Sequence, residues 1–230
     1  MEITRYNPFN QIHKALRALS YDTAIALQQA DFTLEAEMNA VLQRVALLVE
    51  LYENHAYHED YFMFPHLKKL NAGLAEEFDK EHHKDHELGE RIKEAIAAWH
   101  SAADSEGRIK AGWSAYYALN EFIAFNLYHT NKEEREINPV IWKHFTDEEL
   151  LAISHQIVAT IPPDKMAIQG KWMVKGMNDE EINHWAAAIR QSAPDFVFQQ
   201  IVQLITDELS PERSRKILNA VLALPAGKQG

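Results

Sequence analysis

The sequence contains no cysteine among its 230 residues. This absence excludes disulfide bonds, thiolate metal ligands, iron–sulfur clusters and cysteine nucleophiles. Glycine and proline number only 8 each, and so few helix-breaking residues favour long helices. No stretch approaches the roughly 20 apolar residues that span a bilayer, and the first residues lack the basic and apolar regions of a signal peptide. We therefore expect a cytoplasmic protein.

Positive charge is scarce relative to negative charge. Lysine and arginine number 23 against 34 aspartates and glutamates, which gives a net charge of -11 with neutral histidines. Such a surface repels phosphate backbones and anionic lipids, so we expect neither nucleic acid nor a membrane as a partner. Apolar residues make up 47% of the chain, which is enough to build a buried core.

Apolar residues recur at helical spacing along four long segments. The predicted helices run over 8–29, from Thr33 to Pro65, over 72–101, and from about Arg108 to Pro139. We expect both prolines to bend or end their helices, because proline donates no backbone hydrogen bond and clashes with the preceding turn. Four long amphipathic helices joined by short loops predict an all-α fold, an up-down-up-down four-helix bundle.

The last third of the sequence has a different pattern. Thr146 and Asn178 each begin a capping box, and further prolines predict four or five shorter helices without a cluster of metal-binding side chains. We therefore divide the chain into a bundle domain, 1–145, and a C-terminal helical extension, 146–230. Apolar stripes in the extension must pack on something, and we expect either the bundle or a second copy of the chain in a homodimer.

Histidine is abundant and clustered, and two histidines belong to a repeated motif. The chain has 12 histidines, about twice the number that average composition gives. His55 is followed by Glu59 and His129 by Glu133, and in both copies a proline comes six residues after the glutamate. Residues i and i+4 share one helix face, where an imidazole and a carboxylate can bind the same metal ion. The repeat therefore predicts a metal centre between two helices.

Other histidines extend this set of potential ligands. His82 and His86 are again four residues apart on the third predicted helix, and His13 lies on the first. Two metal ions with one or two open coordination positions suit this number of donors. The predicted metal ligands are His13, His55, Glu59, His82, His86, His129 and Glu133.

Aromatic residues crowd both motifs. We interpret them first as core packing, and the alternative, which is compatible with it, is a dry wall that controls the access of small ligands to the metals. The residues are Tyr52, Tyr57, Tyr61, Phe62, Phe64, Phe122 and Phe125.

Over residues 8–145 this arrangement resembles the hemerythrin-like, or HHE cation-binding, proteins. Their pattern is one histidine on the first helix, H-x-x-x-E on the second, one or two histidines on the third, and H-x-x-x-E or H-x-x-x-x-D on the fourth. The resemblance implies two non-haem iron ions, held as an oxo- or hydroxo-bridged pair. Two alternatives stay open: Glu134 could take the place of Glu133, and either His82 or His86 could lie behind a ligand instead of binding metal.

The resemblance also implies a function. We expect a protein that binds or senses dioxygen, nitric oxide or iron, without turnover. The alternative is an oxidase or peroxidase-like di-iron enzyme, or a protein that handles iron or repairs iron centres. The chain lacks the cysteine-bearing segment of the iron–sulfur repair members, and its single E-x-x-H, from Glu181 to His184, argues against a ferritin-like site, which needs two.

Overall fold

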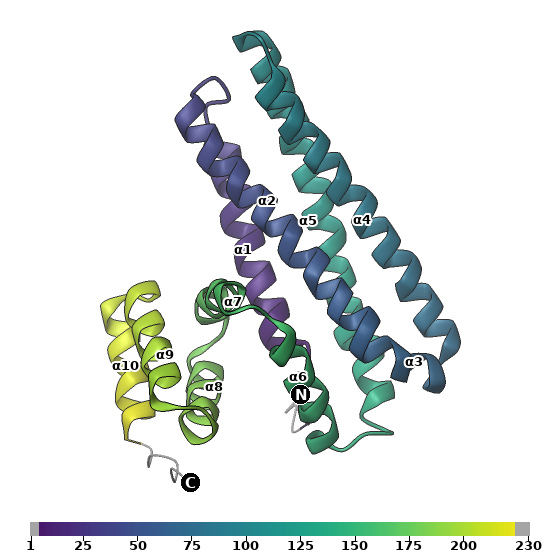
Figure 1. Cartoon of the computed structure of the whole chain (residues 1–230), viewed down its shortest axis with the longest axis vertical. Helices are drawn as coiled ribbons and strands as arrows, with labels where there is room; N and C mark the ends of the chain where they lie inside the picture. The colour runs from purple at the N-terminus through teal and green to yellow at the C-terminus, as the bar shows by residue number, and fades with distance from the viewer. Residues whose placement is uncertain (1–4, 224–230) are drawn as a thin grey trace. The chain divides into compact units, whose positions relative to one another are not determined.

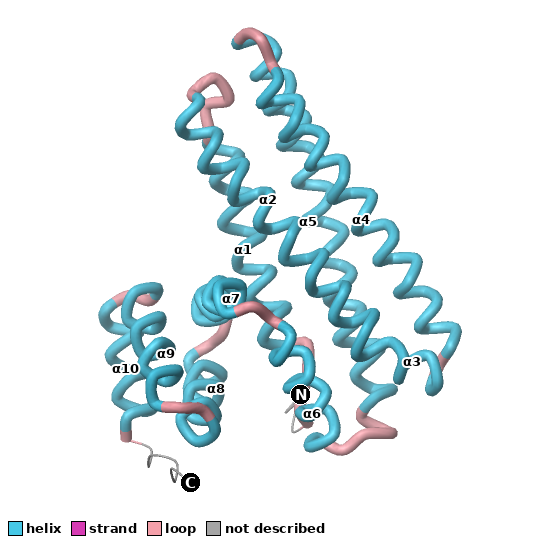
Figure 2. Tube along the Cα trace, in the orientation of Figure 1, coloured by secondary structure: helices cyan, strands magenta, loops and turns pink. Residues whose placement is uncertain are grey.

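The structure is a computed structural model that describes residues 5–223. Within this range the chain forms ten α-helices and one π-helical turn, and no strand (Figure 2). The prediction of an all-α fold is confirmed. No helix in this range is both long and apolar enough to cross a membrane.

Five α-helices and the π-helical turn carry the histidine motifs, and five shorter helices follow them. The first set is α1 (Asn10–Gln29), α2 (Glu35–His58), the π-helical turn η1 (Glu59–Met63), α3 (Phe64–Leu70), α4 (Ala72–Ser101) and α5 (Ser105–Ile141). The second set is α6 (Asp147–Thr160), α7 (Pro163–Gly176), α8 (Asp179–Ser192), α9 (Asp195–Glu208) and α10 (Pro211–Leu222).

The two prolines of the repeat occupy different positions in their helices. Pro65 lies in the first turn of α3, where the missing amide hydrogen costs nothing because that amide has no partner within the helix. The break expected at Pro139 is wrong, because α5 continues through it to Ile141. Only the last residues of α5 follow Pro139, so little of the helix depends on the hydrogen bond that proline cannot donate.

Packing divides the chain into two compact units. The first contains the residues up to Asn10 together with Leu19–Thr160, and the second contains Gln11–Ala18 together with Ile161 and the residues after it. Helix α6 therefore packs with the first unit, where Arg5 donates to Asp147 at 2.6 Å. A domain boundary near residue 145 stays a prediction.

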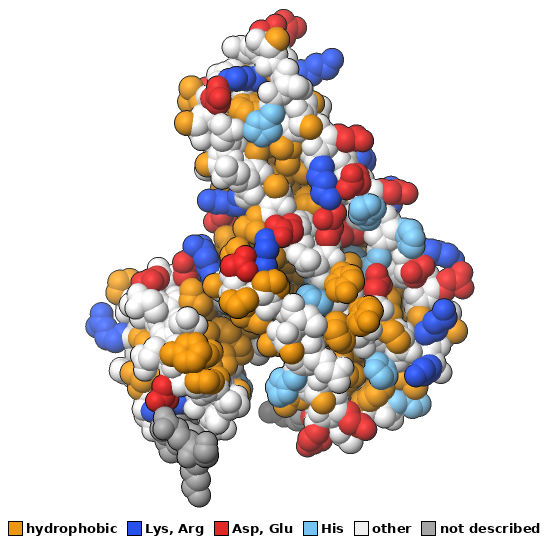
Figure 3. All heavy atoms as spheres, in the orientation of Figure 1, with side chains coloured by type: hydrophobic (Ala, Val, Ile, Leu, Met, Phe, Trp, Pro, Cys, Tyr) orange, Lys and Arg blue, Asp and Glu red, His pale blue; other side chains and the backbone are white. Residues whose placement is uncertain are grey.

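In the first unit the long helices α2, α4 and α5 lie side by side (Figure 1). Residues 102–104 join α4 to α5 directly, whereas η1 and α3 lie between α2 and α4. Their apolar stripes meet in a shared core, in which each fully buried large side chain contributes about 1.5–3 kcal/mol of hydrophobic stabilisation. Acidic and basic side chains are interspersed along the face of the bundle seen in Figure 3. The largest fully buried side chains of this unit include Leu19, Leu48, Tyr52, Phe78, Trp99 and Phe122.

The second unit has a core of its own. Ile182, Phe198, Ile205 and Ile217 are among its buried residues. The capping box predicted at Asn178 is confirmed, since its side chain accepts from the amide of Glu181 at 2.9 Å and the Glu181 carboxylate accepts from the amide of Asn178 at 2.9 Å. Satisfying these amides fixes the start of α8.

Gly112 of α5 packs closely against Phe32, in the loop between α1 and α2. A Cβ atom there would lie 2.3 Å from Cγ of Phe32, whose carbonyl accepts from Nε1 of Trp99 at 2.9 Å. We expect Gly112→Ala to lower the free energy of unfolding by about 1–3 kcal/mol, because the fixed ring cannot yield without strain. Urea denaturation measures the change.

Gly73 of α4 is the matched control for this substitution. The nearest atom to a Cβ at Gly73 would be Oδ1 of Asn71 at 3.8 Å, an ordinary contact. Gly73→Ala should therefore leave stability unchanged or raise it slightly, since alanine favours the helix. Equal effects of the two substitutions would contradict the packing argument.

Candidate metal centre

The first copy of the repeated motif lies where α2 passes into the π-helical turn. His55 is in the last turn of α2 and Glu59 is the first residue of η1, and both side chains are buried. Nε2 of His55 lies 3.2 Å from Oε1 of Glu59. The helical spacing thus brings the imidazole and the carboxylate together, as the sequence predicts. Single π-helical turns inside helices occur frequently at functional sites.

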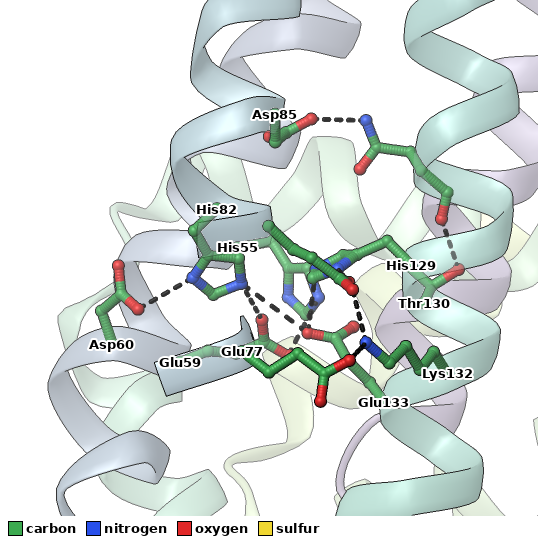
Figure 4. Close-up of polar contacts among 12 residues, drawn as sticks. His55, Glu59, Asp60, Glu77, His82, Asp85, His129, Thr130, Lys132 and Glu133 are labelled. Atoms are coloured by element: carbon green, nitrogen blue, oxygen red, sulfur yellow. Dashed lines mark hydrogen bonds and ion pairs between the residues drawn. The ribbon is translucent and has the colours of Figure 1, made fainter. Parts of the chain in front are cut away.

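The second copy lies within α5, and α4 adds a third histidine. Nε2 of His129 lies 3.0 Å from Oε1 of Glu133, whose side chain is completely buried. His82 of α4 extends between the two motifs, with Nε2 3.3 Å from Oε2 of Glu59 and 3.7 Å from Oε1 of Glu133. Figure 4 shows these side chains pointing toward one another from separate helices.

Four of the side chains form a compact donor set. One nitrogen or oxygen atom from each of Glu59, His82, His129 and Glu133 lies within 4.8 Å of the others. Burying imidazoles and carboxylates is costly unless they are paired or coordinated. Two imidazole nitrogens and carboxylate oxygens suit iron and other transition metals, so these residues fit a metal ion.

A second layer of carboxylates holds two of the imidazoles in place. Nδ1 of His82 donates to Oδ1 of Asp60 at 2.8 Å, and Nδ1 of His129 donates to Oε2 of Glu81 at 2.7 Å. Each bond leaves Nε2 facing the glutamates. Histidines that bind metals almost always donate their other ring nitrogen in this way, which fixes the ring and raises its basicity.

The same contacts control the protonation of His82 and His129. Burial lowers the pKa of His82, but hydrogen bonds to Asp60, Glu133 and Glu59 outweigh it and raise the pKa to about 12. Burial likewise lowers the pKa of His129, and the charge and hydrogen bonds of Glu133 and Glu81 raise it to about 10. Both imidazoles therefore carry a second proton at neutral pH when no metal is bound.

Aromatic side chains cover the imidazoles. Phe64 stacks on His82 with ring centroids 5.0 Å apart, and Phe125 stacks on His129 at 5.8 Å. Phe78, a buried residue of α4, meets the His129 ring edge-on at 5.7 Å. These rings exclude water from one side of the donor set.

Other predicted wall residues lie elsewhere in the first unit. Tyr52 packs against Phe122 in the buried core, with ring centroids 5.3 Å apart. Tyr57 and Tyr61 stack on each other at 5.9 Å but are exposed, so they do not enclose the donor set.

The structure does not bring His86 to the donor set. Its side chain is 65% exposed, with Nδ1 3.6 Å from Oε1 of Glu53. The buried residues of α4 include His82 and Asp85, which are three positions apart on the face that points into the bundle. His86 lies one position beyond this face, or about 100° around the helix.

Glu134 and His13 are the two remaining residues that the sequence analysis considered as ligands. Glu134, the alternative to Glu133, is half-buried and accepts from Nδ2 of Asn7 at 3.3 Å, while Glu133 is the residue in the donor set. His13 is completely buried on α1, in the stretch Gln11–Ala18 that packs with the second unit.

Sequence reasoning missed Asp60 and Glu81, which hold the imidazoles. Both are acidic residues directly beside a ligand candidate, but their side chains are 47% and 20% exposed. A sequence pattern cannot distinguish them from ordinary solvated carboxylates, since their partners lie on other helices.

Comparison with known protein families gives one match. The family described as "Hemerythrin HHE cation binding domain" matches residues 5–141, more than half of the chain. No curated protein and no solved structure matches.

Because His82 and His129 hold extra protons in the metal-free protein, metal binding should release protons. A nitrogen must be unprotonated to bind a metal ion, so filling the site at pH 7 should displace up to two protons from these rings. Affinity should fall as the pH falls, and proton release should decline as the pH rises through about 10. Calorimetric titration with Zn²⁺ in buffers of different ionisation enthalpy measures the release. A buffer-independent enthalpy at pH 7 would contradict the prediction.

Proposed function

The chain belongs to the hemerythrin HHE cation-binding family, and we propose that its buried site holds two non-haem iron ions that bind dioxygen or nitric oxide. The observation that carries the proposal is the convergence of buried imidazoles and carboxylates from α2–η1, α4 and α5. Imidazole and carboxylate without thiolate is a donor set that suits iron.

The arrangement of Glu59 favours two metal ions over one. Its two oxygens face different histidines, with Oε1 toward His55 and Oε2 toward His82. A carboxylate that presents one oxygen to each of two imidazoles is suited to bridge two ions. We propose as ligands His13, His55, Glu59, His82, His129 and Glu133, without His86.

His13 joins this set because of its burial and its position in the chain. It is completely buried, and a buried imidazole requires a polar partner or a metal ion. It also lies within the segment that the family model matches.

The surroundings of the site favour a small ligand and binding over turnover. Bound iron supplies the electrons that dioxygen or nitric oxide shares on binding. The chain's own residues hold the imidazoles through Asp60 and Glu81, and Phe64 and Phe125 exclude water beside them. These contacts orient donors and keep the site dry, which is what reversible binding or sensing requires.

The second unit supports a separate proposal about assembly. It exposes the large apolar side chains of Phe196 and Leu222, which favours a homodimer through the C-terminal helices. The cytoplasmic location stays a prediction.

Metal analysis of the purified protein tests the ligand set. We expect two iron ions per chain, and His55→Ala or His129→Ala should each remove much of the bound metal, because each deletes a direct donor. His86→Ala is the matched control and should retain full occupancy, since His86 lies away from the donor set. One metal ion per chain, or equal losses in all three variants, would contradict the proposed centre.

Stopped-flow mixing of the anaerobic ferrous protein with dioxygen or nitric oxide tests the function. A binding protein should give one spectral change per centre that reverses when the gas is removed. Repeated consumption of dioxygen with an added reductant would instead support the oxidase alternative. Failure of the ferrous protein to react with either gas would exclude both.

A further inference from the structure

Lys132 is a buried lysine beside the proposed metal ligands. It lies on α5 between His129 and Glu133 in sequence and is only 7% exposed. Its Nζ donates to Glu77 and Glu81 of α4, each at 2.5 Å. Burial of an ammonium is costly unless it is paired, so these two carboxylates offset the cost of placing Lys132 there.

Lys132 also packs against an aromatic ring of the site. Its Nζ lies 4.9 Å from the centroid of Phe78, a cation–π contact. The same ring meets His129 edge-on. Lys132 thus touches two of the residues that surround the His129 imidazole, Phe78 and Glu81.

The carboxylate of Glu81 is shared between the lysine and the histidine. Oε1 accepts from Lys132, and Oε2 accepts from Nδ1 of His129 at 2.7 Å. Figure 4 shows the Lys132 side chain pointing toward the carboxylate of Glu77. Because glutamate has three rotatable side-chain bonds, the ammonium restricts Glu81 to the orientation that supports the imidazole.

The carboxylate that supports His82 is not restrained in this way. His82 donates to Asp60, and within residues 5–223 no lysine or arginine forms an ion pair with Asp60. Aspartate is one bond shorter than glutamate and needs less restraint. The effect of Lys132 should therefore be selective for His129.

We propose that Lys132 is a positioning residue of the metal centre, which holds the imidazole of His129 toward Glu133 by restraining Glu81. The inference rests on the proposed function in that it assumes a metal ion in this site. It adds a residue that contacts no metal ion but controls the geometry and retention of the metal.

The test uses the full chain loaded with Co²⁺. Lys132→Met keeps the apolar stem over Phe78 and removes the ammonium, while Lys132→Arg keeps the charge. Lys84→Met is the matched control, because it removes only an exposed pair with Glu87, which contributes little to stability.

Two measurements report on the site. The first is the rate at which Co²⁺ passes to an excess of chelator, which Lys132→Met should raise by about 10–100-fold, the usual effect of removing outer support from a ligand. The second is solvent exchange of the imidazole N–H protons, whose resonances Co²⁺ shifts. The resonances are assigned with Glu81→Gln and Asp60→Asn.

Selectivity distinguishes positioning from general loosening. Lys132→Met should speed exchange of the His129 N–H and leave the His82 N–H unchanged, and Lys132→Arg should restore slow exchange. Equal acceleration of both protons, or no change in either proton or in the release rate, would overturn the inference.

A milder variant covers the case in which Lys132→Met does not fold. Glu77 is 55% exposed, so Glu77→Gln leaves the core intact. It removes one of the two carboxylate charges that hold the ammonium of Lys132. Glu77→Gln should also raise the rate of Co²⁺ release, by less than Lys132→Met does. An unchanged rate would overturn the inference. If the unmodified protein binds no Co²⁺ at all, the proposed function fails as well, whereas a normal site insensitive to Lys132 overturns this inference alone.

Discussion

The structure depends on one constraint, the compensation of two buried carboxylates in the middle of a helical bundle. Glu59 and Glu133 are 4% and 0% exposed, and neither can remain there without a positive group close by. Three imidazoles from the same region meet them at 3.0 to 3.7 Å. Helices α2, α4 and α5 must therefore keep their rotation and register, because a change in any one of them would leave a buried charge without compensation.

This constraint explains why charge is arranged in layers around the site. The inner carboxylates are buried, and the outer carboxylates Glu81 and Asp60 are 20% and 47% exposed. Each outer carboxylate contacts an imidazole on its inner side and water or a cation on its outer side. The electrostatic cost of placing each of these charges thus falls as its exposure to solvent rises.

The sequence predicts the parts of the site that one helix determines. His55 with Glu59 and His129 with Glu133 follow from i,i+4 spacing alone, because both members share a helix face. The choice between His82 and His86 depends on how α4 is rotated. The apolar positions Phe78 and Ile92 already define that rotation, and repeated steps of 3.6 residues from Phe78 pass through positions 82 and 85, not 86.

The outer layer could not be predicted, because each of its contacts joins residues on different helices. Asp60 of η1 supports His82 of α4, and Glu81 of α4 supports His129 of α5. A sequence pattern gives the face on which a residue lies, but not the neighbour opposite that face. The π-helical turn is equally hidden, since residues 59–63 have no composition that separates them from an ordinary α-helix.

The protonation of the site connects this architecture to its chemistry. In the metal-free protein the imidazoles of His82 and His129 hold protons because carboxylates surround them. A metal ion that replaces those protons would bring positive charge to the same place and would likewise compensate Glu59 and Glu133. Most of the apolar core of the first unit is built from other side chains, although Phe64 and Phe78 also contact the imidazoles. The fold is therefore stabilised in two ways, by charge balance around Glu59 and Glu133 and by apolar contacts in the rest of the core.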